Sequence, residues 1–144
     1  MKTLFPIFET GTSVAQGQPG GTALPLLRDV AMDYDRGVPQ FSAGNPVFVT
    51  GLEAVKSWAW RAIKTARYRF SFFSWDYGCE LDALTGQPYD RDTRQSEAVR
   101  YVREALTVCP YITGASVSVE GLDGSKLRIR ASVSTVYGKA ELDV

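Results

Sequence analysis

Histidine is absent from this 144-residue sequence, and cysteine is scarce. Histidine is the commonest general base and metal ligand near neutral pH, so its absence excludes Ser-His-Asp catalysis, Cys-His catalysis and most zinc sites. The two cysteines, Cys79 and Cys109, lie far apart without a CxxC spacing, and we interpret both as small buried thiols. No glycine-rich phosphate loop is followed by a lysine. We therefore predict no metal site and no cofactor.

The sequence also lacks an excess of one charge and any long apolar run. Its 16 basic residues balance 16 acidic ones, so no global positive field favours a nucleic-acid partner. No apolar stretch approaches the roughly 20 residues that cross a bilayer, and no basic n-region with an apolar h-region precedes the cysteines. We expect a soluble protein that is made and folded in a reducing cytoplasm, with no nucleic-acid and no membrane partner.

The first 27 residues predict an extended N-terminal arm. Pro6, Pro19 and Pro25 and several glycines interrupt any periodic pattern there. The arm has an apolar tip of Leu4, Phe5, Ile7 and Phe8. A free tail gains nothing from exposing these side chains to water, so we expect the tip to dock, either on its own domain or on a partner chain.

Residues 28–144 predict one α+β domain. Turn signals at residues 35–37 and 42–46 indicate two hairpins. Apolar residues at helical spacing then predict a helix from Leu52 to Ala66, with Thr50 and Glu53 as a capping box. Trp58 and Trp60 flank this apolar stripe. Because they lie about 200° apart on a helix, we expect one of them to face a second surface.

The second half of the domain predicts a helix followed by strands. Residues 68–78 are dense in aromatics and indicate a strand that runs into a buried aromatic loop. A helix is predicted over residues 93–108, with Asp92 and Gln95 as its cap pair. Alternating apolar and polar residues then predict a hairpin that turns at residues 123–124, and a terminal strand over residues 139–144. The expected fold is therefore α+β, with a small antiparallel or mixed sheet and two main helices.

Paired carboxylates are the remaining candidates for catalysis. Glu80 and Asp82 follow the aromatic segment, which could bind a sugar, so a lysozyme-like cell-wall hydrolase is the alternative function. Asp33 and Asp35 are interpreted as turn-flanking residues. The arginines of the second helix form a basic side, which is either a solvated face balanced by glutamates or a contact for an acidic partner.

Several segments, taken in order and spacing, resemble the baseplate wedge family of short sheath-initiator proteins. The closest likeness is to the branch of Gram-positive myophages and phage-tail-like bacteriocins, and it covers about residues 33–144. The segments that carry the likeness are residues 49–54, 64–69, 77–81, 97–106 and 137–138. The chain departs from the wider family at Cys109-Pro110-Tyr111, where that family has Glu-Pro-Arg.

The resemblance implies a structural protein, not an enzyme, in the baseplate of a virion or phage-tail-like particle. The implied partners are the tail sheath protein, larger wedge proteins and tube or hub proteins, around which the chain would form a sixfold set. It would template the first sheath ring, with β-strand exchange as the means. The apolar tip and the terminal strand are the expected interfaces, because an unpaired strand edge offers its N–H and C=O groups to another chain. The terminal strand comprises Lys139, Ala140, Glu141, Leu142, Asp143 and Val144.

Overall fold

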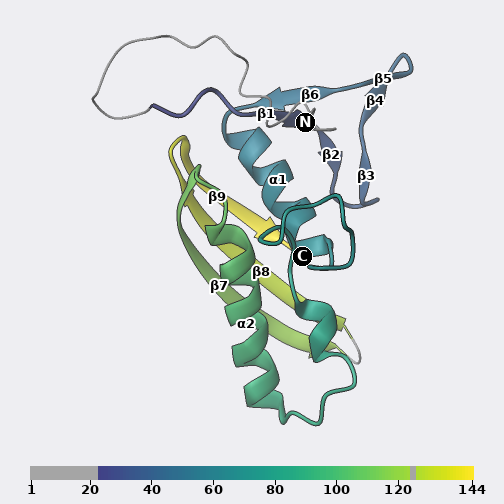
Figure 1. Cartoon of the computed structure of the whole chain (residues 1–144), viewed down its shortest axis with the longest axis vertical. Coiled ribbons are helices and arrows are strands. Elements are labelled where there is room, and N and C mark those ends of the chain that lie inside the picture. Colours follow the sequence, from purple (N-terminus) through teal and green to yellow (C-terminus); the bar gives the residue numbers. More distant parts are fainter. Residues whose placement is uncertain (1–22, 124–125) are drawn as a thin grey trace.

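The computed structural model describes residues 23–123 and 126–144 (Figure 1). The apolar tip of the predicted arm lies outside these residues. The first strands are β1 (Arg28–Val30), β2 (Met32–Asp33), β3 (Val38–Pro39), β4 (Phe41–Ser42), β5 (Asn45–Pro46) and β6 (Phe48–Thr50). The later elements are α1 (Leu52–Lys64), a short 3-10 helix η1 (Leu81–Leu84), α2 (Arg91–Thr107), β7 (Ile112–Asp123), β8 (Lys126–Thr135) and β9 (Gly138–Asp143). The predicted α+β class is confirmed.

The N-terminal strands form short antiparallel ladders. Strand β1 pairs with β6, β2 pairs with β3, and β4 pairs with β5. Asp33 fixes the first turn, because its carboxylate accepts the backbone N–H groups of Asp35 and Arg36, each at 3.1 Å. The two predicted hairpins are therefore confirmed, and the β4–β5 hairpin projects away from the rest of the molecule (Figure 1).

A three-stranded antiparallel sheet of order β7-β8-β9 forms the C-terminal half. Its strands alternate as the sequence predicts, with apolar side chains directed to the core and polar ones to solvent. The buried positions on the described part of this sheet are Ile112, Val117, Ile129, Ala131, Val133, Ala140 and Leu142. Helix α2 packs on β7, α1 packs on β9, and both helices cover the same face (Figure 1). The opposite face therefore remains open to solvent.

Helix α1 lies between the two β regions, and this position explains its two tryptophans. It packs against β1 and β6 on one side and against β9 and α2 on the other. Trp60 meets Tyr34 of the N-terminal region with ring centroids 5.8 Å apart, while Trp58 meets Tyr77 at 5.7 Å. Both tryptophans are buried, each 8% exposed. The helix therefore has two buried faces, which is why one apolar stripe cannot contain both residues.

Both predicted helix caps are wrong. At α1 the N-cap is Gly51, and no side chain caps the helix. Thr50 is instead the last residue of β6, where it pairs with Arg28. At α2 the N-cap is Asp90, whose carboxylate accepts the Thr93 N–H at 3.3 Å. This bond lowers the pKa of Asp90, and the helix starts at Arg91, before the expected position.

The prediction for residues 68–78 is also wrong in two respects. The segment forms turns and bends instead of a strand, and its aromatic side chains lie mostly at the surface instead of in the core. The reason is that the helices and the sheet already fill the core with aliphatic side chains and with Trp58 and Trp60.

Candidate functional site

Strand β9 is held in place by its apolar face, which packs in the core, and by its inner edge, which pairs with β8. Ala140 and Leu142 point into the core and are 8% and 2% exposed. On the edge towards β8, Ala140 pairs with Val133 and Leu142 with Ala131. Burial of these side chains fixes the register, because a one-residue slip would turn Lys139, Glu141 and Asp143 into the core.

The outer edge of β9 carries unpaired backbone groups. Val144 and Ile129 exchange both of their backbone hydrogen bonds, at 2.9 and 3.0 Å. In an antiparallel pair such residues alternate with residues whose backbone groups point away from the partner strand. The outward groups of β9 therefore belong to Lys139, Glu141 and Asp143. Within residues 23–123 and 126–144 these groups have no backbone hydrogen bond to another segment.

Strand β7 forms the other edge of the sheet. The same alternation assigns its outward backbone groups to Ala115, Val117 and Val119. The register shifts at two places along β7, between Ile112 and Gly114 and between Val119 and Gly121. Bulges of this kind twist an edge and hinder strand addition. The β9 ladder shows no such shift, so β9 is the more regular of the two edges.

The solvent face of the sheet is charged but balanced. Arg130 lies between Glu120, at 2.7 Å, and Asp143, at 3.0 Å. These carboxylates raise the pKa of the Arg130 guanidinium, and the hydrogen bond that Arg130 donates to Asp143 is the largest cause. The network links β7, β8 and β9 on the side away from the helices.

Two tyrosines attach the chain that precedes β1 to the start of β9. The Tyr111 hydroxyl donates to the Pro25 carbonyl at 2.7 Å, and the Leu27 N–H donates to the Tyr137 hydroxyl at 3.0 Å. The two rings stack with centroids 6.0 Å apart. Residues 25–27, the end of the predicted arm, are therefore bonded to the domain beside the turn that leads into β9.

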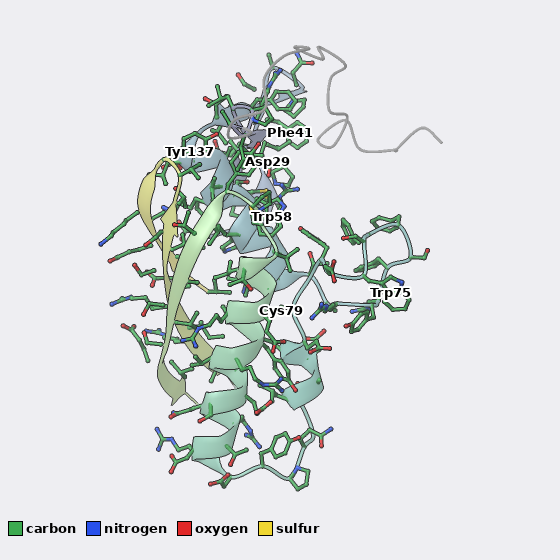
Figure 2. All side chains as sticks on the ribbon, turned by 60° about the vertical axis from the view of Figure 1, so that its left-hand side comes forward. Asp29, Phe41, Trp58, Trp75, Cys79 and Tyr137 are labelled. Atoms are coloured by element: carbon green, nitrogen blue, oxygen red, sulfur yellow. The ribbon has the colours of Figure 1, made fainter. Side chains whose placement is uncertain are left out.

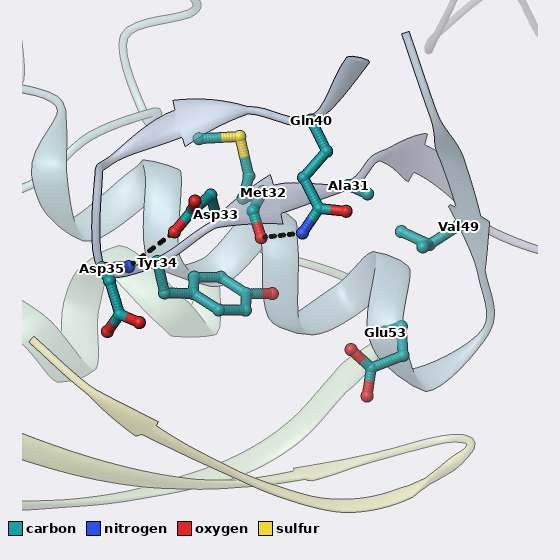
Figure 3. Close-up of a pocket in the computed structure, with 8 residues that line it drawn as sticks. All are labelled: Ala31, Met32, Asp33, Tyr34, Asp35, Gln40, Val49 and Glu53. Atoms are coloured by element: carbon teal, nitrogen blue, oxygen red, sulfur yellow. Dashed lines mark hydrogen bonds between the residues drawn. The ribbon is translucent and has the colours of Figure 1, made fainter. Parts of the chain in front are cut away.

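The first carboxylate pair lines a shallow hollow of about 440 Å³ beside α1 (Figure 3). Asp33 is used by its own turn, as the sequence predicts, and Asp35 is exposed. Across the hollow Gln40 donates to the Met32 carbonyl at 3.2 Å. Burial and the carboxylates of Glu53 and Asp29 raise the pKa of Tyr34. The polar side chains that line the hollow are therefore explained by contacts that hold the N-terminal strands and their turn in place.

The second pair lies at η1. Glu80 is the N-cap residue of this short helix without a side-chain capping bond, and Asp82 is exposed in its first turn. Neither lines the hollow beside α1. The hydrolase alternative that rests on Glu80 and Asp82 stays a prediction.

On α2, Arg100 pairs with Glu97 and with Glu104, the latter at 3.3 Å. These pairs favour the interpretation of the basic side of α2 as a solvated face that glutamates balance.

Within the described part of the chain, no group of three or more histidine, cysteine, aspartate or glutamate side chains is arranged to hold a metal ion. None of the helices described is both long and apolar enough to span a bilayer.

The two cysteines are buried free thiols, as the sequence predicts. They are 3% and 4% exposed, and burial raises the pKa of Cys79 to about 11 and also raises that of Cys109. Because the thiolate is the reactive form, we expect neither thiol to react with Ellman's reagent at pH 8 in the native protein. Both should react in 6 M guanidinium chloride. Rapid labelling of the native chain would contradict the packing around these residues.

Comparison with known proteins gives two matches. Residues 28–138 match the family described as contractile injection system sheath initiator. The chain is also similar to the phage-like element PBSX protein XkdS of Bacillus subtilis (strain 168). The two are 29% identical over 96 residues, which cover 66% of this chain and 68% of that protein.

Proposed function

Because the chain belongs to the sheath-initiator family of contractile injection systems, we propose that it is a structural baseplate protein which templates the first ring of the tail sheath. The observation that carries the proposal is the outer edge of β9, with which no strand of the described residues pairs. The inner edge and the apolar face of this regular strand are both fixed by the domain. Such an outer edge accepts a further strand without rearrangement of the core.

The proposed contact is strand exchange with a sheath subunit. An incoming strand would pair with the outward N–H and C=O groups of Lys139, Glu141 and Asp143. The backbone hydrogen bonds would set the register of the incoming strand, and each contributes about 0.5–1.5 kcal/mol net. Repetition of the contact around the ring would raise the affinity of the sheath ring for the baseplate. The charged side chains of the same residues discourage pairing with a second β9, because charges on an edge are a common protection against self-association.

The proposal includes further partners and a location. Larger wedge proteins and tube or hub proteins would hold a sixfold set of these chains around the tube, in the baseplate of a virion or phage-tail-like particle. The apolar tip of Leu4, Phe5, Ile7 and Phe8 would grip a neighbouring baseplate chain. Membership of the family and the similarity to a phage-element protein support a place among the sheath and baseplate components of a contractile tail.

The test is the amount of this chain in purified tail particles. Particles are isolated on a density gradient, and the chain is quantified against sheath and tube proteins by mass spectrometry. We expect a small fixed copy number, equal to one ring, which is retained when the sheath is stripped. Absence from the particle, or an amount that scales with sheath length, would overturn the proposal.

A further inference from the structure

Residues 67–78, here called the aromatic loop, leave the domain after α1 and return at Cys79. Figure 2 shows the loop projecting from the body of the protein, with Trp75 far from the sheet. Trp75 is 77% exposed, and Tyr68, Phe70 and Phe72 are also exposed. The exposed rings of Trp75, Tyr68 and Phe70 form an apolar surface on one short loop.

The base of the loop is rigid. The Arg67 N–H donates to the Cys79 carbonyl at 3.1 Å, and the Cys79 N–H donates to the Thr65 carbonyl at 2.9 Å. The Arg67 side chain then reaches into the loop, where it donates to the Trp75 carbonyl at 3.0 Å and lies 3.8 Å from Asp76. The loop is thus preorganised, and binding a partner costs little conformational entropy.

Gly78 is the residue that permits this closure. Its φ is +107°, and a Cβ there would lie 2.9 Å from the Cα of Arg67 and 3.0 Å from the Thr65 carbonyl oxygen. We expect Gly78→Ala to lower the unfolding temperature by roughly 6 °C and to speed amide exchange at Cys79. Gly86→Ala is the matched control, since Gly86 also has positive φ but open space around it, and its cost should be about half as large. Equal costs would show that the loop base is loose.

A chain of ring contacts connects the loop to the core. Trp58 meets Tyr77, Tyr77 lies 4.6 Å from Phe73, and Phe73 lies 4.5 Å from Phe72, between ring centroids. On the other side of the loop the rings of Tyr68 and Trp75 lie 5.2 Å apart. Phe72 is therefore connected to the buried Trp58 through the half-buried rings of Phe73 and Tyr77.

Two arginines of the aromatic loop lie over its rings. The Arg67 guanidinium lies 5.1 Å from the Tyr68 ring centroid, and that of Arg69 lies 5.6 Å from the Phe70 centroid. Asp76 is the one acidic residue of residues 67–78, and it pairs with Arg67. Arg69 has no ion pair with any residue in the described ranges. The loop therefore presents a net positive charge within an apolar surface.

We propose that the aromatic loop is a second protein-docking surface, which binds an acidic, apolar segment of another baseplate protein. Tryptophan, tyrosine and arginine dominate the energetics of protein interfaces, and aromatic residues with arginine are enriched at interface centres. The net positive charge of the loop, with Arg69 in no ion pair within the described residues, favours a carboxylate on the partner, and the rings favour apolar side chains beside it. The inference rests on the proposed function, since it takes other tail proteins as neighbours, and it assigns the baseplate contact to a surface distinct from β9.

Photocrosslinking in intact particles tests the contact. The photoreactive residue p-benzoylphenylalanine replaces Trp75, or Arg103 on the exposed side of α2 as the control, and the crosslinked peptides are identified by mass spectrometry. We expect the Trp75 position to crosslink to an acidic, apolar segment of a different baseplate protein, and the Arg103 position not to do so. Crosslinks to residues 1–22 of the same chain, to a second copy or to the sheath, or no crosslink from a particle that contains the chain, would overturn the inference.

The amount of the chain in particles before irradiation shows whether a failed crosslink contradicts the proposed function or only the loop contact. A chain that is missing from wild-type particles contradicts both proposals, whereas a chain that is present without the expected crosslink contradicts only the loop contact.

Charge reversal provides a second test. Arg69→Glu places like charge against the partner's carboxylate, so we expect incorporation into particles to fall at least tenfold while the unfolding temperature of the purified chain stays unchanged. Arg103→Glu is the matched control and should incorporate normally. Normal incorporation of the Arg69→Glu chain would show that the partner is not acidic.

Discussion

The Glu141→Pro chain is expected to fold and to enter baseplates but to start at least tenfold fewer sheaths than the wild type. Glu141 lies in the middle of β9, its side chain is exposed, and its N–H points away from β8. Proline therefore removes no bond of the protein's own sheet, and edge strands tolerate it. It does remove the central donor to an incoming strand and places a ring against that strand. One lost hydrogen bond with a steric clash exceeds the 1.4 kcal/mol that corresponds to a factor of ten.

Three other variants define what this result means. Glu141→Ala keeps the N–H and should start sheaths normally, which separates the backbone from the side chain. Ala115→Pro removes an outward N–H from β7 and should also be tolerated, which separates the two edges. Leu142→Pro removes a bond to β8 at a buried residue and should unfold the chain. The number of sheathed tails counted by electron microscopy is the measurement, and normal counts for Glu141→Pro would exclude strand exchange at β9.

The Asp29→Ala chain is expected to lose about 3 kcal/mol of stability, or roughly 10 °C in unfolding temperature. Asp29 is 3% exposed, and its carboxylate binds the Arg61 guanidinium of α1. Its other oxygen accepts the Val30 N–H at 2.7 Å. The Ser57 hydroxyl donates to the Val30 carbonyl at 2.6 Å, so the same contacts join β1 to α1. Removal of the carboxylate leaves the Arg61 charge half-buried without its partner.

The cost should depend on which part of Asp29 is lost. Burial raises the pKa of Asp29 and the Arg61 charge partly offsets this, so a neutral amide is tolerated better than a methyl group. Asp29→Asn keeps an acceptor for Val30 and should cost less than Asp29→Ala. Asp35→Ala, at an exposed carboxylate, should change stability by no more than about 0.5 kcal/mol. Chemical denaturation of the purified chains measures all three, and equal values for Asp29→Ala and Asp35→Ala would contradict the structural role of the Asp29–Arg61 pair.

The regular elements were predictable because their residues repeat with a clear period. The alternation around Val117, Ile129 and Leu142 has period two, and the stripe that includes Val102 and Leu106 has helical spacing. All five side chains are buried. Burial on one face determines both patterns, and no knowledge of neighbouring segments is needed to recognise them.

The caps and the aromatic segment were not predictable from local patterns. Thr50 has the residue type and spacing of a cap, but its pairing with Arg28 in the β1–β6 ladder takes priority, and that pairing joins distant parts of the chain. The exposure of Trp75 depends on the core being filled already by other segments. Aromatic density marked residues 68–78 as unusual, but only the three-dimensional arrangement shows them at the surface.

The candidate site was predictable in part. The sequence indicates a half-buried terminal strand over residues 139–144, and the structure forms it as β9. Which backbone groups point outward follows only from the register with β8, because that register sets the alternation for Lys139, Glu141 and Asp143. The aromatic loop was missed as a surface, although its combination of aromatics with Arg67 and Arg69 is the composition of an interface.

In vitro sheath assembly tests the central claim most directly. Baseplate–tube complexes are purified from cells with and without this chain, mixed with purified sheath subunits and examined by electron microscopy. If the chain templates the first ring, sheaths grow from the baseplate of complete complexes, and addition of the purified chain during baseplate assembly restores growth to the deficient ones. Sheaths of normal length and position on complexes that lack the chain would contradict the claim.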